Sequence, residues 1–388
     1  MSRALVAAET SLAFVLVVSS GLLLRSFVSM ITRSRGFEPR GVITASIELP
    51  TARYDIKAAN DFHRRAVERV AALPGVREAA FSSDLPWTGY DENTGFSIAG
   101  RTFPRGDEPE ARYHFITGGY ARAVGTPLVA GRDLTAADTE NAPAVLLVNE
   151  SAARKYWTTP LAAVGARVNH WGRDRTIVGV VADVSDMPWH DRAVPALYMP
   201  QPQTWYPQPM FLVVRCDVDP ESLVDPIRRA LGAIDPELPL SNVRPLEAVA
   251  GAALATRRLT LWLVAAFGLT ALLLAVIGVY GVAAEAVGQR RHEFGVRQAL
   301  GATRGDIMRL VFSSGATVTI VGLAAGVILA AGFTRSLVSL LYGIAPLDPA
   351  TFASVAVVLV AAAGGAAYLP ARRATRISPA IVLRAGDQ

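Results

Sequence analysis

Four stretches of this chain are apolar on every helical face, and polar segments of very different lengths separate them. They cover residues 4–24, 259–284, 310–333 and 350–369, and the last three contain no charged residue. A helix of about 20 apolar residues spans a hydrocarbon core of roughly 30 Å. The pattern therefore predicts an α-helical membrane protein with four transmembrane helices. One long polar segment, residues 28–258, separates the first helix from the second.

The first stretch also allows a second interpretation, as a cleaved signal peptide. Its apolar run is longer than the core of a usual signal peptide, and no A-x-A-like cleavage site follows it. Arg25, Arg33 and Arg35 lie just beyond it, as an anchor at a membrane edge would. We therefore expect residues 1–27 to hold transmembrane helix 1.

The arginines of the short segments predict the orientation in the membrane. The loop 285–309 and the tail 370–388 carry Arg290, Arg291, Arg297, Arg304, Arg309, Arg372, Arg373, Arg376 and Arg384. The loop 334–349 has a single arginine. The positive-inside rule then places the loop 285–309 and both termini in the cytoplasm, and residues 28–258 outside. The arginines around helix 1 favour the opposite orientation, because only Arg3 precedes it.

The outer segment begins and ends with similar strand–helix–strand units. Residues 42–49 alternate apolar and polar positions, residues 58–73 have apolar positions at helical spacing, and residues 76–82 form the next strand. The closing unit has strands at 210–215 and 238–243, with a helical stripe between them. These two units predict a split β-α-β sandwich of α/β type.

An inserted mixed subdomain separates the two units. Its predicted strands are 144–149 and 176–184, with a short helix at 150–156. A helical stretch, residues 245–258, leads without a break into the second transmembrane helix and predicts a stalk.

Composition agrees with a membrane protein. Hydrophobic residues make up 51% of the chain and charged residues 18%, against about 25% charged residues in soluble domains. The small net charge of +5 is explained by the arginines of the predicted cytoplasmic segments. The sequence shows no basic face with interleaved aromatic residues, so it does not indicate nucleic-acid binding. The single cysteine, Cys216, cannot form an internal disulfide bond.

Sequence motifs for catalysis are missing. There is no P-loop and no G-x-S-x-G elbow. His292 and Glu293 begin like a zinc-protease motif, but Val296 replaces the second histidine. We therefore expect no catalytic, cofactor-binding or metal site, and no enzyme.

The isolated polar residues of the outer segment do not change this view. His63, His114, His170 and His190 lack the spacing of metal ligands. Asp84 and Asp91 lie near Pro86 and Gly89, which predict a loop with solvated carboxylates.

Residues 289–300 combine charge with apolar positions in the predicted cytoplasmic loop. They can form a short helix that Gly301 ends, and Thr303 with Asp306 then predicts a capping box for the third transmembrane helix. The residues alone leave two interpretations open: a helix on the membrane surface, or a docking surface for a cytoplasmic partner.

The run from Gln289 to Ala302, QRRHEFGVRQALGA, resembles the Q-R-x-x-E-[IF]-G-[IV]-R-x-A-L-G-A signature of FtsX/MacB-type ABC transporter permeases. In that family the segment is a coupling helix that seats in a groove of the ATPase subunit. The resemblance implies an ATPase-contacting role, with Phe294 as the anchor in the groove and Glu293 and Arg297 as polar contacts. The residues implied are Gln289, Arg290, Glu293, Phe294, Gly295, Val296, Arg297, Ala299, Leu300 and Gly301.

Shorter segments along the chain are also similar to this family. They are residues 21–27, 131–134, 148–151, 177–181, 341–349 and 370–374. Among its subtypes the chain most resembles one half of the duplicated orphan permeases of acidobacteria. This resemblance implies either a single-half permease that dimerises or the second half of a longer protein.

The resemblance implies the permease subunit of an ABC transporter in the bacterial inner membrane, with a MacB-like periplasmic core domain. A separate cytoplasmic ATPase would drive efflux or export by mechanotransmission. The implied partners are this ATPase, a second permease copy or half, membrane lipid and a periplasmic adaptor, without cofactor or nucleic acid. The alternatives are an FtsX-like regulator or scaffold of an extracytoplasmic partner, and a membrane-anchored ectoenzyme.

Overall fold

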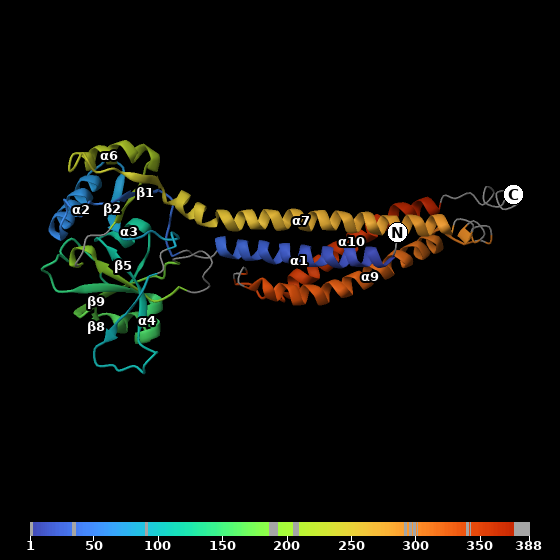
Figure 1. Ribbon diagram of the computed structural model, residues 1–388, viewed down its shortest axis with the longest axis horizontal. Helices are drawn as coiled ribbons and strands as arrows, with labels where there is room; N and C mark the ends of the chain where they lie inside the picture. Colours follow the sequence, from blue (N-terminus) through green and yellow to red (C-terminus); the bar gives the residue numbers. More distant parts are fainter. Residues whose placement is uncertain are drawn as a thin grey trace. The chain divides into compact units, whose positions relative to one another are not determined.

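The computed structural model describes residues 3–32, 36–89, 92–185, 193–204, 209–290, 293–294, 297, 300, 302–338, 341 and 343–375. The chain forms two compact units (Figure 1). We call the first, Met1–Thr32 with Thr256–Gln388, the membrane unit, and the second, Arg33–Ala255, the outer domain.

The frame of the outer domain is a split β-α-β sandwich. Its elements are β1 (Val42–Ile47), α2 (Ile56–Ala71), β2 (Val76–Ser82), β11 (Met210–Cys216), α6 (Val224–Gly232) and β12 (Ser241–Pro245), with the short helix η2 (Pro220–Leu223) before α6. The strands lie in the order β12-β1-β11-β2, and each neighbouring pair is antiparallel. This order arises because each helix returns the chain to a strand two places away.

The apolar stripes of α2 and α6 form one core with a face of this sheet. Phe62 and Val70 of α2 and Ile227 of α6 pack with Phe81 and Val214 of the strands. Helix α2 begins at Asp55, whose carboxylate accepts a hydrogen bond of 2.7 Å from the backbone N–H of Ala58.

The inserted subdomain extends the same sheet. Its elements are β3 (Asn93–Gly95), β4 (Ser97–Ile98), β5 (Glu110–Ile116), α3 (Tyr120–Val124), β6 (Leu128–Gly131), β7 (Val145–Asn149), α4 (Glu150–Trp157), α5 (Pro160–Ala163), β8 (Arg167–His170), β9 (Arg173–Val181), β10 (Ala196–Pro200) and η1 (Gln201–Gln203). The strand order continues as β5-β10-β7-β9-β8-β4, with β3 on β5 and β6 on β9.

The sheet joins frame and insertion at one place, and a shared core also joins them, in which Ala80 and Val213 of the frame pack with Tyr120 and Val124 of the insertion. Strands β2 and β5 share the single register pair Ser82–Ile116. The chain leaves the frame after Ser82 and re-enters it at β11, where Phe211 is the register partner of Ser82. Both ends of the insertion therefore lie on adjacent strands. The predicted mixed α/β fold is confirmed, although the insertion has more strands than the two predicted.

The membrane unit contains four helices long and apolar enough to cross a membrane, which confirms the predicted number among the described residues. They are α1 (Arg3–Thr32), α7 (Leu246–Gln289), α9 (Arg304–Ser336) and α10 (Pro349–Ala374). Helix α7 is continuous over 44 residues and includes both the predicted stalk and the second span.

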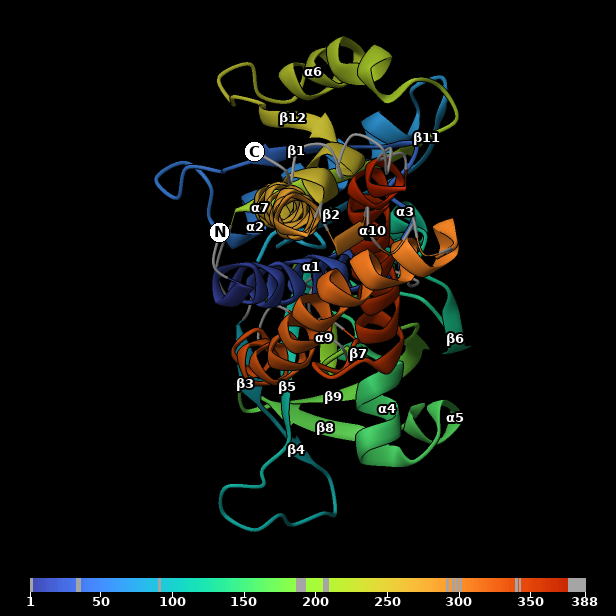
Figure 2. The same cartoon turned by 90° about the vertical axis from the view of Figure 1, so that its right-hand side faces the viewer.

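Helix α1 lies between α7 and α9 (Figures 1 and 2). Glycines allow this close approach. A Cβ atom on Gly326 of α9 would lie 2.8 Å from the Cβ atom of Phe14, and one on Gly322 would lie 2.7 Å from that of Thr10. Such small residues let helix backbones pack tightly in membranes.

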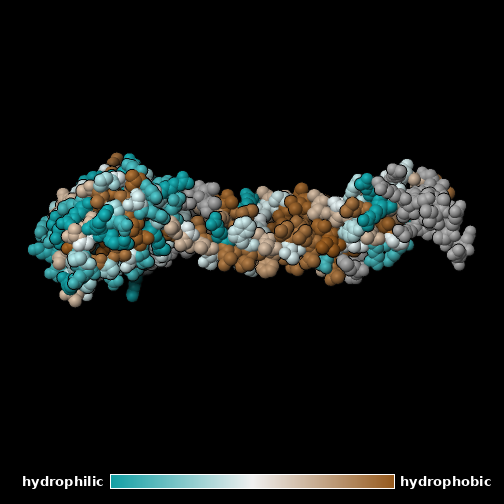
Figure 3. Space-filling model, turned by 90° about the horizontal axis from the view of Figure 1, so that it is seen from above, coloured by the Kyte–Doolittle hydropathy of each residue, from teal (hydrophilic) through white to brown (hydrophobic). Residues whose placement is uncertain are grey.

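The surface of the membrane unit is apolar (Figure 3). Trp262, Phe267, Ile277, Ile328 and Val357 are each more than 60% exposed. A surface in contact with water rarely carries so many large apolar side chains, whereas lipid tails cover them without cost.

Candidate functional site

The coupling segment, which we define as residues 289–302, connects α7 to α9. The structure describes Gln289, Arg290, Glu293, Phe294, Arg297, Leu300 and Ala302 of this segment. The predicted site residues Gly295, Val296, Ala299 and Gly301 lie outside the described residues.

Phe294 is directed into the protein. Its side chain is 1% exposed and packs in a cluster with Val287 of α7, Ile307 and Val311 of α9, and Ala371 of α10. The role that the resemblance implies for Phe294, an anchor in a groove of the ATPase, stays a prediction. In the structure the ring attaches the coupling segment to the membrane unit, because the ends of three helices enclose it.

The charged residues of the segment lie on its exposed side. Glu293 forms an ion pair of 2.7 Å with Arg297 and a longer one of 3.9 Å with Arg290. The spacing of three and four residues places these side chains on one helical face. Gln289 donates a 3.2 Å hydrogen bond to Glu285, one turn earlier on α7.

Near the end of the segment, Leu300 is an exposed apolar side chain, with 83% of its surface accessible. Shortly after it, the backbone N–H of Asp306 donates to the hydroxyl of Thr303, and the Thr303 N–H donates to the Asp306 carboxylate. The predicted capping box is thus confirmed.

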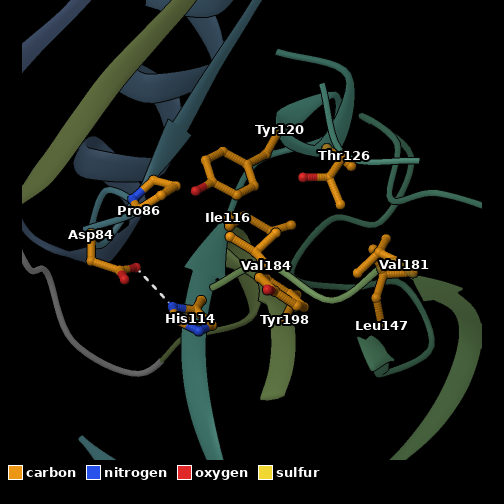
Figure 4. Close-up of a pocket in the computed structure, with 11 residues that line it drawn as sticks. Asp84, Pro86, His114, Ile116, Tyr120, Thr126, Leu147, Val181, Val184 and Tyr198 are labelled. Atoms are coloured by element: carbon orange, nitrogen blue, oxygen red, sulfur yellow. Dashed lines mark hydrogen bonds and ion pairs between the residues drawn. The ribbon is translucent and has the colours of Figure 1, made fainter. Parts of the chain in front are cut away.

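The outer domain contains a buried polar pair that the sequence did not predict. Asp84 is 7% exposed, and its carboxylate lies 2.8 Å from Nδ1 of His114, whose ring stacks on Tyr198 (Figure 4). The expected solvated loop carboxylate is therefore wrong for Asp84, because its partner lies thirty residues away on β5. Asp91 lies outside the described residues.

The cavity beside this pair is small. Its volume is about 20 Å³, and Tyr120 and Ile116 form part of its wall (Figure 4). That is room for roughly one water molecule, so no substrate fits next to the Asp84–His114 pair. We interpret the pair as a structural hydrogen bond that satisfies two polar groups in the core.

The other described histidines are also buried. Burial lowers the pKa of His63 and of His170 to about 4, and the nearby charge of Arg175 adds to the effect on His170. His190 lies outside the described residues. Over the described part of the chain, no three histidine, cysteine or acidic side chains gather as metal ligands would.

Curated relatives share a limited part of this chain. It is 34% identical over 112 residues to the pyoverdine export ATP-binding/permease protein PvdT of Pseudomonas savastanoi pv. phaseolicola, which is 29% of this chain and 17% of the relative. It is 34% identical over 124 residues to the macrolide export ATP-binding/permease protein MacB of Bradyrhizobium diazoefficiens, which is 31% of this chain and 19% of that protein. The matches thus span less than a fifth of the relatives' length.

Among solved structures, the periplasmic region of MacB from Actinobacillus actinomycetemcomitans aligns with 58% of this chain and 97% of that one. The sequence identity is 15% and the TM-score 0.38.

Two family models match the chain and together cover most of it. The model of the MacB-like periplasmic core domain matches residues 10–233, more than half of the chain. The model of the FtsX-like permease C-terminal region matches residues 265–379, which include the coupling segment and helices α9 and α10. The chain therefore belongs to the family of FtsX-like permeases with a MacB-like periplasmic core domain.

Proposed function

We propose that this chain is the membrane subunit of an ABC export complex. A separate cytoplasmic ATPase binds the coupling segment, and its ATP-driven motion passes through the membrane helices to the periplasmic domain. The names of the relatives, both export ATP-binding/permease proteins, support this proposal. In the alternative function, the chain regulates a periplasmic partner without transport. That function requires the same contact with the ATPase.

The observation that carries the proposal is the two-sided coupling segment. Phe294 ties it to the ends of α7, α9 and α10, whereas Arg290, Arg297 and Leu300 face outward. When the ATPase displaces a segment attached in this way, the attached helices move with it. The ATPase contact then uses Leu300 as the apolar centre and the Glu293–Arg297 pair as its polar rim.

The arginine distribution supports cytoplasmic termini and a cytoplasmic coupling segment. The packing is consistent with the N-terminus lying on the same side as the coupling segment. Val6 near the start of α1 lies in one cluster with Val282 near the end of α7 and Ala366 in the later part of α10. We further propose that two permease copies or halves act together, with each coupling segment facing one ATPase subunit.

The test is ATPase stimulation in a reconstituted complex. The full chain is purified in nanodiscs with an ABC ATPase from the same genome, and ATP hydrolysis is compared for wild type and Leu300→Asp. We expect Leu300→Asp to lower the stimulated rate at least tenfold while the fold is retained. The control is Leu161→Asp, which changes a leucine that is 76% exposed in the outer domain.

Equal stimulation by wild type and Leu300→Asp would refute the docking role of the coupling segment. If ATP hydrolysis responds to Leu300→Asp but no export of any tested compound depends on the complex, the regulatory alternative is favoured.

A further inference from the structure

A crevice opens between α1 and α7 close to the point where each helix passes into the outer domain. The side chains that line it come from both helices and are Leu23, Ser26, Phe27, Met30, Arg257, Thr260 and Leu261. Its volume is about 40 Å³, room for roughly three water molecules. A single phosphate or carboxylate group fits such a space, whereas a whole organic ligand needs several times more.

The crevice begins where a tight contact between the two helices ends. The hydroxyl of Ser20 donates a 2.9 Å hydrogen bond to the carbonyl of Val264, and a Cβ atom on Gly268 would lie 2.7 Å from the same hydroxyl oxygen. The lining residues follow Ser20 on α1 and precede Val264 on α7. The helices are therefore in contact on one side of the crevice and leave space between them on the other.

Two consecutive arginines of α7 differ in their surroundings. Arg257 lines the crevice and is half-buried, whereas Arg258 is exposed and does not line it. Thr260 uses its hydroxyl hydrogen inside the helix, where it donates to the carbonyl of Thr256 at 3.0 Å. Arg257 is thus the only charged residue among the described residues that line the crevice. A guanidinium has several N–H donors, so contacts with the protein still leave donors for an anion.

The position of Arg257 along α7 is that of a residue near lipid headgroups. It precedes the apolar stretch 259–284 by two residues. Trp262, which is exposed, follows within the next two turns of the helix. Tryptophan is enriched at the boundary between membrane and water, and long basic side chains reach towards that boundary. The crevice therefore lies at the level of the phosphate groups.

The surroundings favour an anionic group that carries apolar chains. Most of the other lining residues are apolar, and Leu24 and Leu259, each next to a lining residue in the sequence, are more than half exposed. Acyl chains cover such surface favourably, whereas a free anion gains nothing from it. A phospholipid combines both parts, because its glycerol joins an anionic phosphate to two acyl chains.

A phosphate site also accounts for an irregularity in the arginine distribution. Arg25 and Arg257 lie on the predicted outer side, which the positive-inside rule leaves poor in basic residues. Arg25 forms an ion pair with Asp348. Binding of a lipid phosphate gives Arg257 a role on this side too, because phospholipids form both leaflets of a membrane.

We propose that the crevice binds the phosphate group of a membrane phospholipid through Arg257, with the acyl chains on the exposed apolar faces of α1 and α7. The planar guanidinium donates charge-assisted hydrogen bonds to two phosphate oxygens. The bound lipid fills the space where the two helices separate and so fixes their spacing next to the outer domain. This inference does not depend on the ATPase contact, because the chain and the lipid alone form the complex.

The experiment is native mass spectrometry of the full chain, delipidated in detergent, without ATPase. The probes are dioleoylphosphatidylglycerol, dioleoylglycerol, which lacks the phosphate, and glycerol phosphate, which lacks the chains. We expect the first phosphatidylglycerol molecule to bind roughly tenfold more tightly than either fragment. Arg257→Gln should weaken its binding by roughly tenfold or more, because charge-assisted hydrogen bonds are lost. Arg258→Gln removes the same charge one residue away and should bind as wild type does.

A steric variant tests the location without changing any charge. Leu261→Trp fills the crevice and should weaken the binding of phosphatidylglycerol, whereas Leu274→Trp, at an exposed position further along α7, should not. Thermal unfolding in detergent provides a second readout. The lipid should raise the midpoint of wild type and Arg258→Gln but not that of Arg257→Gln, because a ligand that binds only the folded state stabilises it.

Three results would overturn the proposal. Equal losses in Arg257→Gln and Arg258→Gln would indicate general attraction of an anionic lipid to a basic surface. Equal binding of dioleoylglycerol and phosphatidylglycerol would exclude recognition of the phosphate, and equal binding of glycerol phosphate would assign the crevice to a free anion. Unchanged binding in Leu261→Trp would place the lipid elsewhere, and this result counts even if Arg257→Gln fails to fold.

Discussion

Arg25 of α1 forms an ion pair with Asp348, the residue that caps the start of α10. The same carboxylate accepts hydrogen bonds from the backbone N–H of Thr351 at 2.8 Å and from its hydroxyl at 2.6 Å. The pair places the later part of α1 at the same edge of the membrane unit as the start of α10. The pair therefore supports α1 and α10 running in opposite directions, which places the N-terminus on the same side as the end of α10. The arginines around helix 1 taken alone favoured the opposite side for the N-terminus.

The two functions of Asp348 can be separated by substitution. Asp348→Asn removes the charge but keeps an oxygen that can cap α10, so we expect a loss of about 1 kcal/mol or less, because the pair is partly exposed. Asp348→Ala also removes the cap and should cost about 1 kcal/mol more. Thermal unfolding midpoints in detergent should therefore fall in the order wild type, Asn, Ala. Equal midpoints for the two variants would exclude a capping contribution.

Phe294 and Leu300 should respond in opposite ways to truncation. Phe294→Ala leaves a cavity where three helices meet and should lower the free energy of unfolding by about 3 kcal/mol or more. Leu300→Ala removes an exposed side chain and should change stability by less than about 0.5 kcal/mol. Thermal unfolding of the two variants side by side measures the difference. A Phe294→Ala protein as stable as wild type would contradict the inward placement of the ring.

The close packing of α1 on α9 predicts a steric effect of glycine replacement. At Gly322 an added Cβ atom meets Thr10 at 2.7 Å, so Gly322→Ile should destabilise the membrane unit by about 2 kcal/mol or more. Gly332 on the same helix has no heavy atom within 4 Å of such a Cβ, so Gly332→Ile is the matched control. Thermal midpoints in detergent and the yield of monodisperse protein should fall for the first variant only.

His63 should make the outer domain sensitive to acid. Its pKa is about 4 in the folded state and near 6.5 when unfolded, so the unfolded state binds more protons between these values. Stability is therefore lost as the pH falls from about 6.5 towards 4, by up to roughly 3 kcal/mol for this group. In His63→Phe this contribution is absent. Urea unfolding at pH 7 and pH 4.5, followed by tryptophan fluorescence, should show a smaller loss in the variant than in wild type.

Acidic groups also titrate over part of this pH range, but they do so in both proteins. The difference between wild type and His63→Phe isolates the histidine. Identical losses in the two proteins would contradict a buried, neutral His63.

Removing Asp84 should destabilise the outer domain. Asp84→Ala leaves the Nδ1 atom of His114 without its 2.8 Å partner inside the core and should cost about 1 to 3 kcal/mol. Urea unfolding at pH 7 measures this loss. Asp107→Ala, in an exposed turn, is the control and should unfold as wild type does.

The helices and the frame could be predicted because their signals are local. Twenty apolar residues define a span by themselves, and the stripe of Phe62, Ala66 and Val70 together with Pro74-Gly75 defines α2 and its end. The insertion was harder to predict. Its strands β3, β4 and β6 have four residues or fewer and depend on partners that are distant along the chain.

Side-chain direction was the part that the sequence could not supply. In a short amphipathic segment, Phe294 can face a partner or its own helices, and only the positions of α9 and α10 decide between them. Asp84 likewise follows a strand beside a proline and a glycine, a context typical of surface loops, and its burial depends on His114 from β5. The assignment to an acidobacterial duplicated type stays a prediction.

The adjacent register of Ser82 and Phe211 has a consequence for how this domain can diversify. The insertion enters and leaves the frame at neighbouring positions, so it behaves as an exchangeable cassette. A shorter or longer cassette leaves the strand order of the frame and the core around α2 and α6 intact. The insertion shares a core with Leu246, Val249 and Ala250 at the start of α7, so any change of the cassette has to preserve its packing on the helix that continues into the membrane.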